Sequence, residues 1–264
     1  MRLLTLLIIP LLAASSCSLS AKQPQKKTTS AAATSVAEEK VAKALNDAAV
    51  AIDSLVETEE PQILRLTEDD YVAVAQRLGV EVASIKAVTE IEAGKTHEGF
   101  SAPGVPLVNF DLTMFKRFAG KRGINLSKYY KSHPQVFRRS GGSSQANVNK
   151  RLKAARSIDN NTAIEGTFWG MFQIGGFNWK LCGCSSIDEF LELMSRSERD
   201  QLELFANFIS NSGLLKYLKA KNWTAFARGY NGPSYASRRY HTRLASAYAK
   251  YKKSEPQPKP TEEE

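Results

Sequence analysis

The sequence predicts a mostly α-helical fold. Beyond residue 67, apolar side chains recur at three- and four-residue spacing in most segments, which is the period of an amphipathic helix. Capping residues bound several of these segments. Strand patterns are scarce: residues 107–110 are the one short apolar run that could form an edge strand, and residues 141–144 (GGSS) indicate a loop.

The first sixteen residues are predicted to be a removable secretion signal. Arg2 precedes an apolar stretch over residues 3–14, which is too short to span a bilayer and is interrupted by Pro10. Residues 14–17 (ASSC) resemble the lipobox of bacterial lipoproteins, so Cys17 is expected to become a lipidated N-terminus. The alternative is ordinary cleavage, for example after Ser20, which would release a soluble protein.

Residues 17–66 are expected to form a tether and then a separate amphipathic helix. The stretch over 18–35 is rich in Ser, Thr, Ala, Lys and Gln and has almost no large apolar residue. Over 35–56, Ser35 and Glu38 match a capping box, and apolar residues follow at 4-3-4-3 spacing. Two heptads are too few for a coiled coil, so this helix could pack on its own chain, remain loose or bind an envelope protein partner.

The main domain is predicted over residues 67–252. Thr67 is the N-cap of a helix that ends at Gly79, and a second helix runs over 81–93. Further helices are expected over 112–119, 146–162, 187–194, 198–211, 223–228 and 235–252. Residues 253–264 are polar and rich in Pro, which predicts a disordered tail.

Composition and charge exclude several classes of function. The chain has 36 Lys and Arg against 27 Asp and Glu, and its net charge of +9 favours an anionic partner. The three His are far apart, and Cys182 and Cys184 have no second ligand pair, so no metal and no cofactor are assigned. The sequence has no Gly-rich phosphate loop or nucleophile elbow, which argues against nucleotide chemistry and specific nucleic-acid binding.

Carboxylates remain as candidates for catalysis, and Glu92 is preferred to Glu90. Residues two apart on a helix point about 200° from each other, so the two cannot line one cleft wall. Glu92 falls on the apolar face that contains Ile85 and Val88, whereas Glu90 has ion-pair spacing to Lys86. The end of a helix and an apolar surround both raise the pKa of a carboxyl group, as a general acid requires. A buried Glu could equally be structural.

Three blocks of sequence resemble one known family. They are residues 78–92 (LGVEVASIKAVTEIE), 168–178 (FWGMFQIGGFN) and 226–235 (FARGYNGPSY). In order and spacing they are similar to the N-acetylmuramidase domain of modular phage endolysins, which is itself similar to lysozymes and soluble lytic transglycosylases. The resemblance implies a lysozyme-like helical domain with a sugar-binding groove. It also implies cleavage of the β-1,4 bond between N-acetylmuramic acid and N-acetylglucosamine in peptidoglycan, with Glu92 as general acid.

The resemblance implies further site residues. Asp111 stands where the family has a second carboxylate, usually Glu, and the shorter side chain suits a base that activates water better than a nucleophile. The implied substrate-binding residues are Gln173, Tyr230, Asn231, Trp169 and Tyr235. For each of them, packing or turn structure is the alternative role, and Glu165 is expected to be structural.

The sequence thus predicts a peptidoglycan muramidase of the bacterial envelope, held by its lipid on a membrane and facing the periplasm, or soluble there. Two other functions remain open. A lytic transglycosylase would need only Glu92 and would form 1,6-anhydro products. A non-catalytic lipoprotein would bind peptidoglycan in the groove without turnover.

Overall fold

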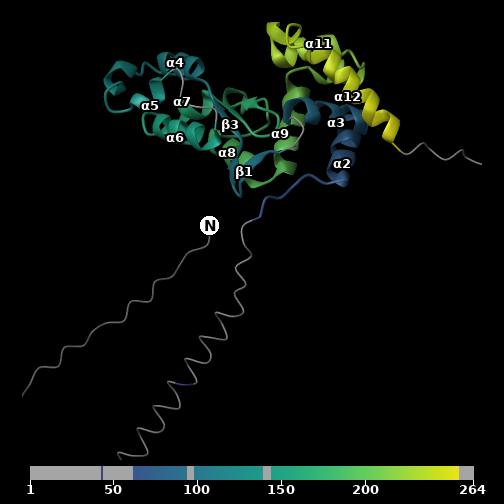
Figure 1. The fold of residues 1–264 in the computed structure, drawn as a ribbon, viewed down its shortest axis with the longest axis horizontal. Coiled ribbons are helices and arrows are strands. Elements are labelled where there is room, and N and C mark those ends of the chain that lie inside the picture. Colours follow the sequence, from purple (N-terminus) through teal and green to yellow (C-terminus); the bar gives the residue numbers. More distant parts are fainter. Residues whose placement is uncertain (1–42, 44–61, 94–97, 139–143, 256–264) are drawn as a thin grey trace, which may run out of the picture. The chain divides into compact units, whose positions relative to one another are not determined.

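The computed structural model describes Lys43 and residues 62–93, 98–138 and 144–255 (Figure 1). The chain divides into residues 1–59 and 60–264, and of the first unit only Lys43, which is helical, is described. The predicted signal, Cys17, the tether, the rest of the helix over 35–56 and residues 256–264 lie outside the described residues. Within the described residues, no helix is long and apolar enough to cross a membrane.

The described part of the chain is mostly helical, as predicted. Its helices are α2 (Glu68–Leu78), α3 (Val82–Ala93), α4 (Leu112–Lys121), α5 (Pro134–Phe137), α6 (Gln145–Arg156), α7 (Asn160–Glu165), α8 (Ile187–Arg196), α9 (Glu198–Asn211), α10 (Leu215–Lys219), α11 (Trp223–Asn231) and α12 (Tyr240–Ser254). Single 3-10 turns cover Leu126–Tyr129, Gly176–Asn178 and Pro233–Tyr235.

Two predicted helices have different boundaries in the structure. The segment over 146–162 forms two helices, because the Asp159 side chain accepts a hydrogen bond of 2.8 Å from Thr162 N and caps α7. The segment over 235–252 becomes helical only at Tyr240. Arg239 precedes it with a φ of 57°, a left-handed conformation that cannot continue a right-handed helix.

Short antiparallel strands join the helices, and most of them were not predicted. They are β1 (Phe100–Ala102), β2 (Val105–Pro106), β3 (Val108–Phe110), β4 (Thr167–Trp169) and β5 (Ile174–Gly175). Strands β1 and β2 form a hairpin, and the others form a sheet in the order β3-β4-β5. The predicted edge strand is confirmed as β3, whose Asn109 lies opposite Phe168 of β4. Strands of two or three residues are too short for an alternating pattern to reveal them.

The helices pack around one apolar core. Helix α3 packs against both α2 and α12, α9 packs against α2 and α8, and α4 and α6 pack against α7 (Figure 1). The largest fully buried side chains include Phe115, Phe172, Phe190, Phe205 and Phe226. These packing relations hold the C-terminal end of α3 in place from two sides.

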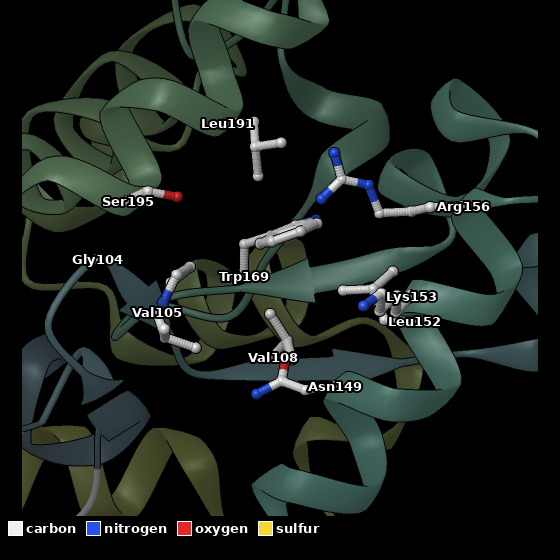
Figure 2. Close-up of a pocket in the computed structure, with 11 residues that line it drawn as sticks. Gly104, Val105, Val108, Asn149, Leu152, Lys153, Arg156, Trp169, Leu191 and Ser195 are labelled. Carbon is white, nitrogen blue, oxygen red and sulfur yellow. The ribbon is translucent and has the colours of Figure 1, made fainter.

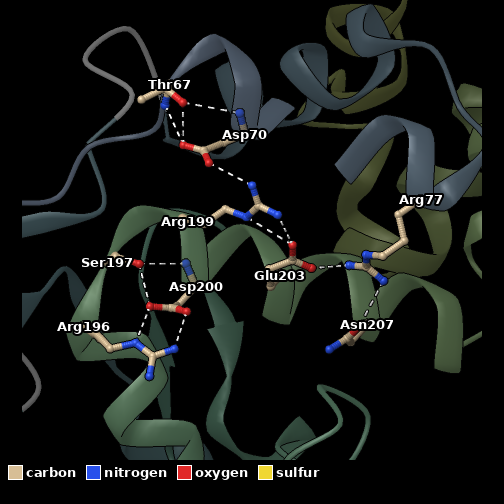
Figure 3. A network of polar contacts seen from close by, with 9 residues as sticks. All are labelled: Thr67, Asp70, Arg77, Arg196, Ser197, Arg199, Asp200, Glu203 and Asn207. Carbon is tan, nitrogen blue, oxygen red and sulfur yellow. Dashed lines mark hydrogen bonds and ion pairs between the residues drawn. The ribbon is translucent and has the colours of Figure 1, made fainter. Parts of the chain in front are cut away.

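Charged side chains fix α2 on α9 (Figure 3). Thr67 and Asp70 form a capping box at the start of α2, which confirms the predicted N-cap. Arg199 of α9 donates to Asp70 at 2.8 Å and to Glu203 at 2.5 Å, and Glu203 also binds Arg77. Because α2 supports α3, this network contributes to the position of Glu92.

Candidate active site

Glu92 lies partly buried in the last turn of α3. Burial raises the pKa of Glu92 to about 7, while the neighbouring Asn231 amide and the Arg243 guanidinium act in the opposite direction. A carboxyl group with this pKa is protonated to a large extent at neutral pH. It can therefore donate a proton to a leaving oxygen atom, which is the role of a general acid.

Glu90 has a different environment from Glu92. Its carboxylate accepts a hydrogen bond of 2.6 Å from Lys250 Nζ and forms an ion pair between α3 and α12. Lys86, which the sequence spacing paired with Glu90, instead binds Glu68 of α2 at 2.6 and 2.7 Å. Both residues thus form ion pairs with other helices. Glu90 has the ion-pair environment that the sequence predicted for it, and this distinguishes it from Glu92.

The end of α11 brings Tyr230 and Asn231 close to Glu92. Burial raises the pKa of Tyr230 well above its ordinary value, and the charge of Glu92 adds to the increase. The Tyr230 hydroxyl donates a hydrogen bond of 2.7 Å to the carbonyl oxygen of Phe172. Asn231 Nδ2 is buried and makes no other hydrogen bond among the described residues, but it lies close enough to Glu92 to lower the pKa of that carboxyl group.

The turn between β4 and β5 holds Gln173. Gly170 and Gln173 have φ angles of 67° and 47°, a left-handed conformation that is strained for a residue with a Cβ atom such as Gln173. Gln173 Nε2 donates to Gly170 O at 2.9 Å, and Met171 N donates to the buried Gln201 side chain at 2.7 Å. A Cβ atom on Gly170 would lie 2.6 Å from Gln201 Oε1, so this approach requires glycine.

Asp111 caps a helix in the structure. Its Oδ1 accepts hydrogen bonds from Thr113 N at 2.7 Å and Met114 N at 3.0 Å at the start of α4, and its backbone N donates to Gly166 O. Helix α4 packs on α7, whereas α3, which carries Glu92, packs on α2 and α12. Asp111, which follows β3, and Glu92 are therefore held by different sets of helices.

Two aromatic residues from the resemblance have other contacts in the structure. Trp169 is only 3% exposed and its Nε1 donates to Ile164 O at 3.0 Å, while the residue also lines a cavity, so its role in sugar stacking stays a prediction. Tyr235 packs edge-on against His241 and lines a separate hollow at α11. Glu165 forms an ion pair of 2.6 Å with Arg122, in line with its expected structural role.

A cavity of about 480 Å³ lies between the β1–β2 hairpin, α6 and α8 (Figure 2). Its described lining includes no carboxylate. Val105, Val108, Trp169 and Leu191 supply apolar surface, and Lys153 and Arg156 supply positive charge. This cavity can bind a ligand but contains no acid for glycoside cleavage.

The described residues contain no group of three or more His, Cys, Asp or Glu side chains that could hold a metal ion. Cys182 and Cys184 are buried free thiols, and burial raises the pKa of both, that of Cys184 to about 11. Neither thiol is therefore a thiolate at neutral pH.

Comparison with known proteins shows the family of this chain. Residues 81–252 match the N-acetylmuramidase family. The chain is also similar to the crystal structure of Burkholderia AP3 phage endolysin, with 34% sequence identity, a TM-score of 0.64 and 72% of each chain covered. A search of curated proteins finds no match.

Proposed function

The chain belongs to the N-acetylmuramidase family of lysozyme-type peptidoglycan hydrolases, and we propose that Glu92 is its general acid. The observation that carries the proposal is the environment of Glu92: partial burial, a pKa raised to about 7, and an Asn231 amide and an Arg243 guanidinium nearby. The bond cleaved is the β-1,4 bond from N-acetylmuramic acid to N-acetylglucosamine.

In the proposed reaction, protonated Glu92 donates its proton to the glycosidic oxygen as the bond from that oxygen to C1 of N-acetylmuramic acid breaks. Burial retains the proton on Glu92 up to neutral pH. Once the proton has left, the Asn231 amide and the Arg243 charge stabilise the carboxylate, since both favour the ionised form. Water then adds to C1, and its second proton passes to a base.

Asp111 is the proposed base that activates the water. Its Oδ1 is held by two backbone N–H groups of α4, which fixes the orientation of the carboxylate and leaves Oδ2 to accept the proton. An inverting glycosidase of this kind holds its carboxyl groups about 6.5 to 9.5 Å apart. A second candidate function is that of a lytic transglycosylase, a reaction that needs only Glu92. The capping hydrogen bonds of Asp111 favour it, because they give this residue a structural role that is independent of catalysis.

Two amides are proposed to bind the N-acetyl groups of the substrate. Asn231 Nδ2 is buried and carries two N–H groups, of which one faces the Glu92 carboxylate and the other is left for a substrate oxygen. Gln173 Nε2 donates a hydrogen bond to Gly170 O, so the side-chain oxygen of Gln173 is the atom proposed to accept a hydrogen bond from the substrate. Tyr230 donates its hydroxyl to Phe172 O, and we assign it a positioning role rather than direct binding.

We further propose that the enzyme acts in the bacterial envelope as a lipoprotein, with Cys17 as the lipidated residue. The support is the ASSC segment after a short apolar run. A Cys17→Ser variant should move from the membrane fraction to the soluble fraction and lose incorporation of a labelled fatty acid. Ordinary cleavage would leave wild type and variant in the same fraction. An envelope protein as partner of the helix predicted over residues 35–56 is part of the same proposal.

Mass spectrometry of products from purified peptidoglycan tests the function, with the full chain beside Glu92→Gln. Products with reducing-end N-acetylmuramic acid that disappear in the variant support hydrolysis by Glu92. Products with 1,6-anhydro ends assign a transglycosylase. Binding without any release would contradict the proposed activity.

A further inference from the structure

A hollow of about 400 Å³ lies between α3 and α12, near the C-terminal end of α3. Its lining residues are Glu90, Ile91, Arg239, Thr242, Arg243, Ser246, Ala247 and Lys250. The residues from α12 stand at positions i, i+1, i+4, i+5 and i+8, counted from Thr242, so they form one face of the helix. We refer to this feature as the α3–α12 hollow.

The α3–α12 hollow has an excess of positive charge. Lys250 is neutralised by Glu90 at 2.6 Å. Arg239 and Arg243 are exposed and form no ion pair within the described parts of the chain. The Arg243 guanidinium lies over the Tyr240 ring, with its central carbon 5.5 Å from the ring centroid, and its charge also acts on Glu92. Arg239 and Arg243 therefore bring two positive charges to the hollow.

The charged end of the α3–α12 hollow lies next to the proposed acid. Helices α3 and α12 run antiparallel: Ala83 N, at the start of α3, donates at 2.8 Å to Glu255, just after the end of α12. At the opposite end, Arg243 acts electrostatically on Glu92, and Ile91, the residue before Glu92, lines the hollow. The hollow thus lies at the end of α3 that carries Glu92, although Glu92 itself does not line it, and an extended peptide attached to the sugar being cleaved could reach it.

We propose that Arg239 and Arg243 of the α3–α12 hollow bind a carboxylate of the peptide stem on the N-acetylmuramic acid residue being cleaved. The inference rests on the proposed function. A stem peptide begins on the sugar whose C1 reacts, and it carries free carboxylates. Guanidinium groups bind carboxylates through paired, charge-assisted hydrogen bonds. The site would make the enzyme prefer glycan strands that retain their peptides.

Kinetics of full-length Arg239→Gln test the proposal, with Arg238→Gln as a matched control. Arg238 is the neighbouring exposed arginine and does not line the hollow. The substrates are peptide-bearing glycan strands and the same strands stripped of peptides by an amidase, with the lactyl carboxylate that the amidase exposes converted to its methyl amide. We expect Arg239→Gln to raise KM on peptide-bearing strands about five- to tenfold, as for one charge-assisted hydrogen bond at an exposed site. Its kcat and its KM on stripped strands should match wild type, and Arg238→Gln should match wild type on both.

An equal rise in KM for Arg239→Gln and Arg238→Gln on peptide-bearing strands would overturn the proposal. It would indicate general attraction between a basic surface and an anionic wall. Equal KM values of wild type on the two substrates would also overturn it. If wild type cleaves neither substrate, the proposed function fails. Calorimetric titration with the disaccharide, with and without its peptide, then tests the hollow. Selective loss of peptide-dependent binding in Arg239→Gln supports it, and unchanged binding overturns it.

Discussion

The hydroxyl of Tyr230 donates a hydrogen bond of 2.7 Å to the carbonyl oxygen of Phe172, which joins the end of α11 to the turn after β4. Phe172 is fully buried and stacks on Phe205 of α9 with ring centroids 4.5 Å apart. Because Tyr230 also lies close to Glu92, this bond connects the turn that carries Gln173 to the proposed acid.

Replacing Tyr230 with Phe should destabilise the protein and slow turnover. The variant leaves the buried Phe172 carbonyl without its donor, which costs about 1 to 3 kcal/mol in the free energy of unfolding. The loosened turn should reduce kcat more than substrate binding. Urea unfolding and kinetics measure the two effects, with Tyr217→Phe on α10 as control. An unchanged kcat would show that the bond is only structural.

Glu92→Gln should reduce cleavage about 10²- to 10⁴-fold, the range for loss of a general acid, while peptidoglycan binding is retained. Glu90→Gln is the matched control, because it removes a carboxylate two residues away on the same helix that pairs with Lys250. It should retain activity close to wild type. A larger loss in Glu90→Gln than in Glu92→Gln would contradict the assignment of the acid.

The rate should fall as pH rises above about 7, because only protonated Glu92 can donate. Arg243→Gln removes a charge that lowers the pKa of Glu92, so the falling limb of the pH–rate profile should move to higher pH, whereas Arg238→Gln should leave it in place.

The raised pKa of Glu92 also determines how the free energy of unfolding changes with pH. Between the ordinary value of 4.5 and about 7, folded protein binds more protons than unfolded protein, so stability should fall as pH rises. Movement of the falling limb of the Arg243→Gln rate profile to lower pH would contradict the assignment of that limb to Glu92.

Asp111→Asn and Asp111→Ala separate the two tasks of this residue. Asn retains an oxygen that can accept the backbone hydrogen bonds of α4, so its stability should equal that of wild type, but it cannot act as a base. Ala loses the cap and about 1 kcal/mol. We expect Asp111→Asn to lose hydrolysis. Retained turnover with 1,6-anhydro products would instead identify a transglycosylase.

Gln201→Leu should be strongly destabilising. Buried Gln201 accepts a hydrogen bond from Met171 N and donates to Met194 O at 2.9 Å and Gly99 O at 3.3 Å. An apolar side chain leaves these groups unpaired, at about 1 to 3 kcal/mol for each buried group. Thermal unfolding measures the loss. Gln76→Leu on the exposed side of α2 is the control, and equal melting temperatures of the two variants would contradict the prediction.

Features that depend on near neighbours in the chain were predictable. Thr67 and Gly79 bound α2 as expected, because a cap acts over three or four residues. Helical spacing also predicts different environments for Glu92 and Glu90, and the structure shows Glu92 partly buried and Glu90 in an ion pair. By contrast, β1, β2, β4 and β5 are too short for any pattern, and their pairing partners are up to about sixty residues away in the chain.

The amino-acid sequence by itself determined the helical class, the family and the choice of Glu92, because caps, spacing and motifs are local in the chain. Only the tertiary structure decided what surrounds those residues. It placed Trp169 in the core, used Asp111 as the cap of α4, and brought Tyr230, Asn231 and Arg243 to Glu92. The physical reason is that burial and electrostatic interaction depend on distance in space. Tyr230, Asn231 and Arg243 lie well over one hundred residues from Glu92 along the chain.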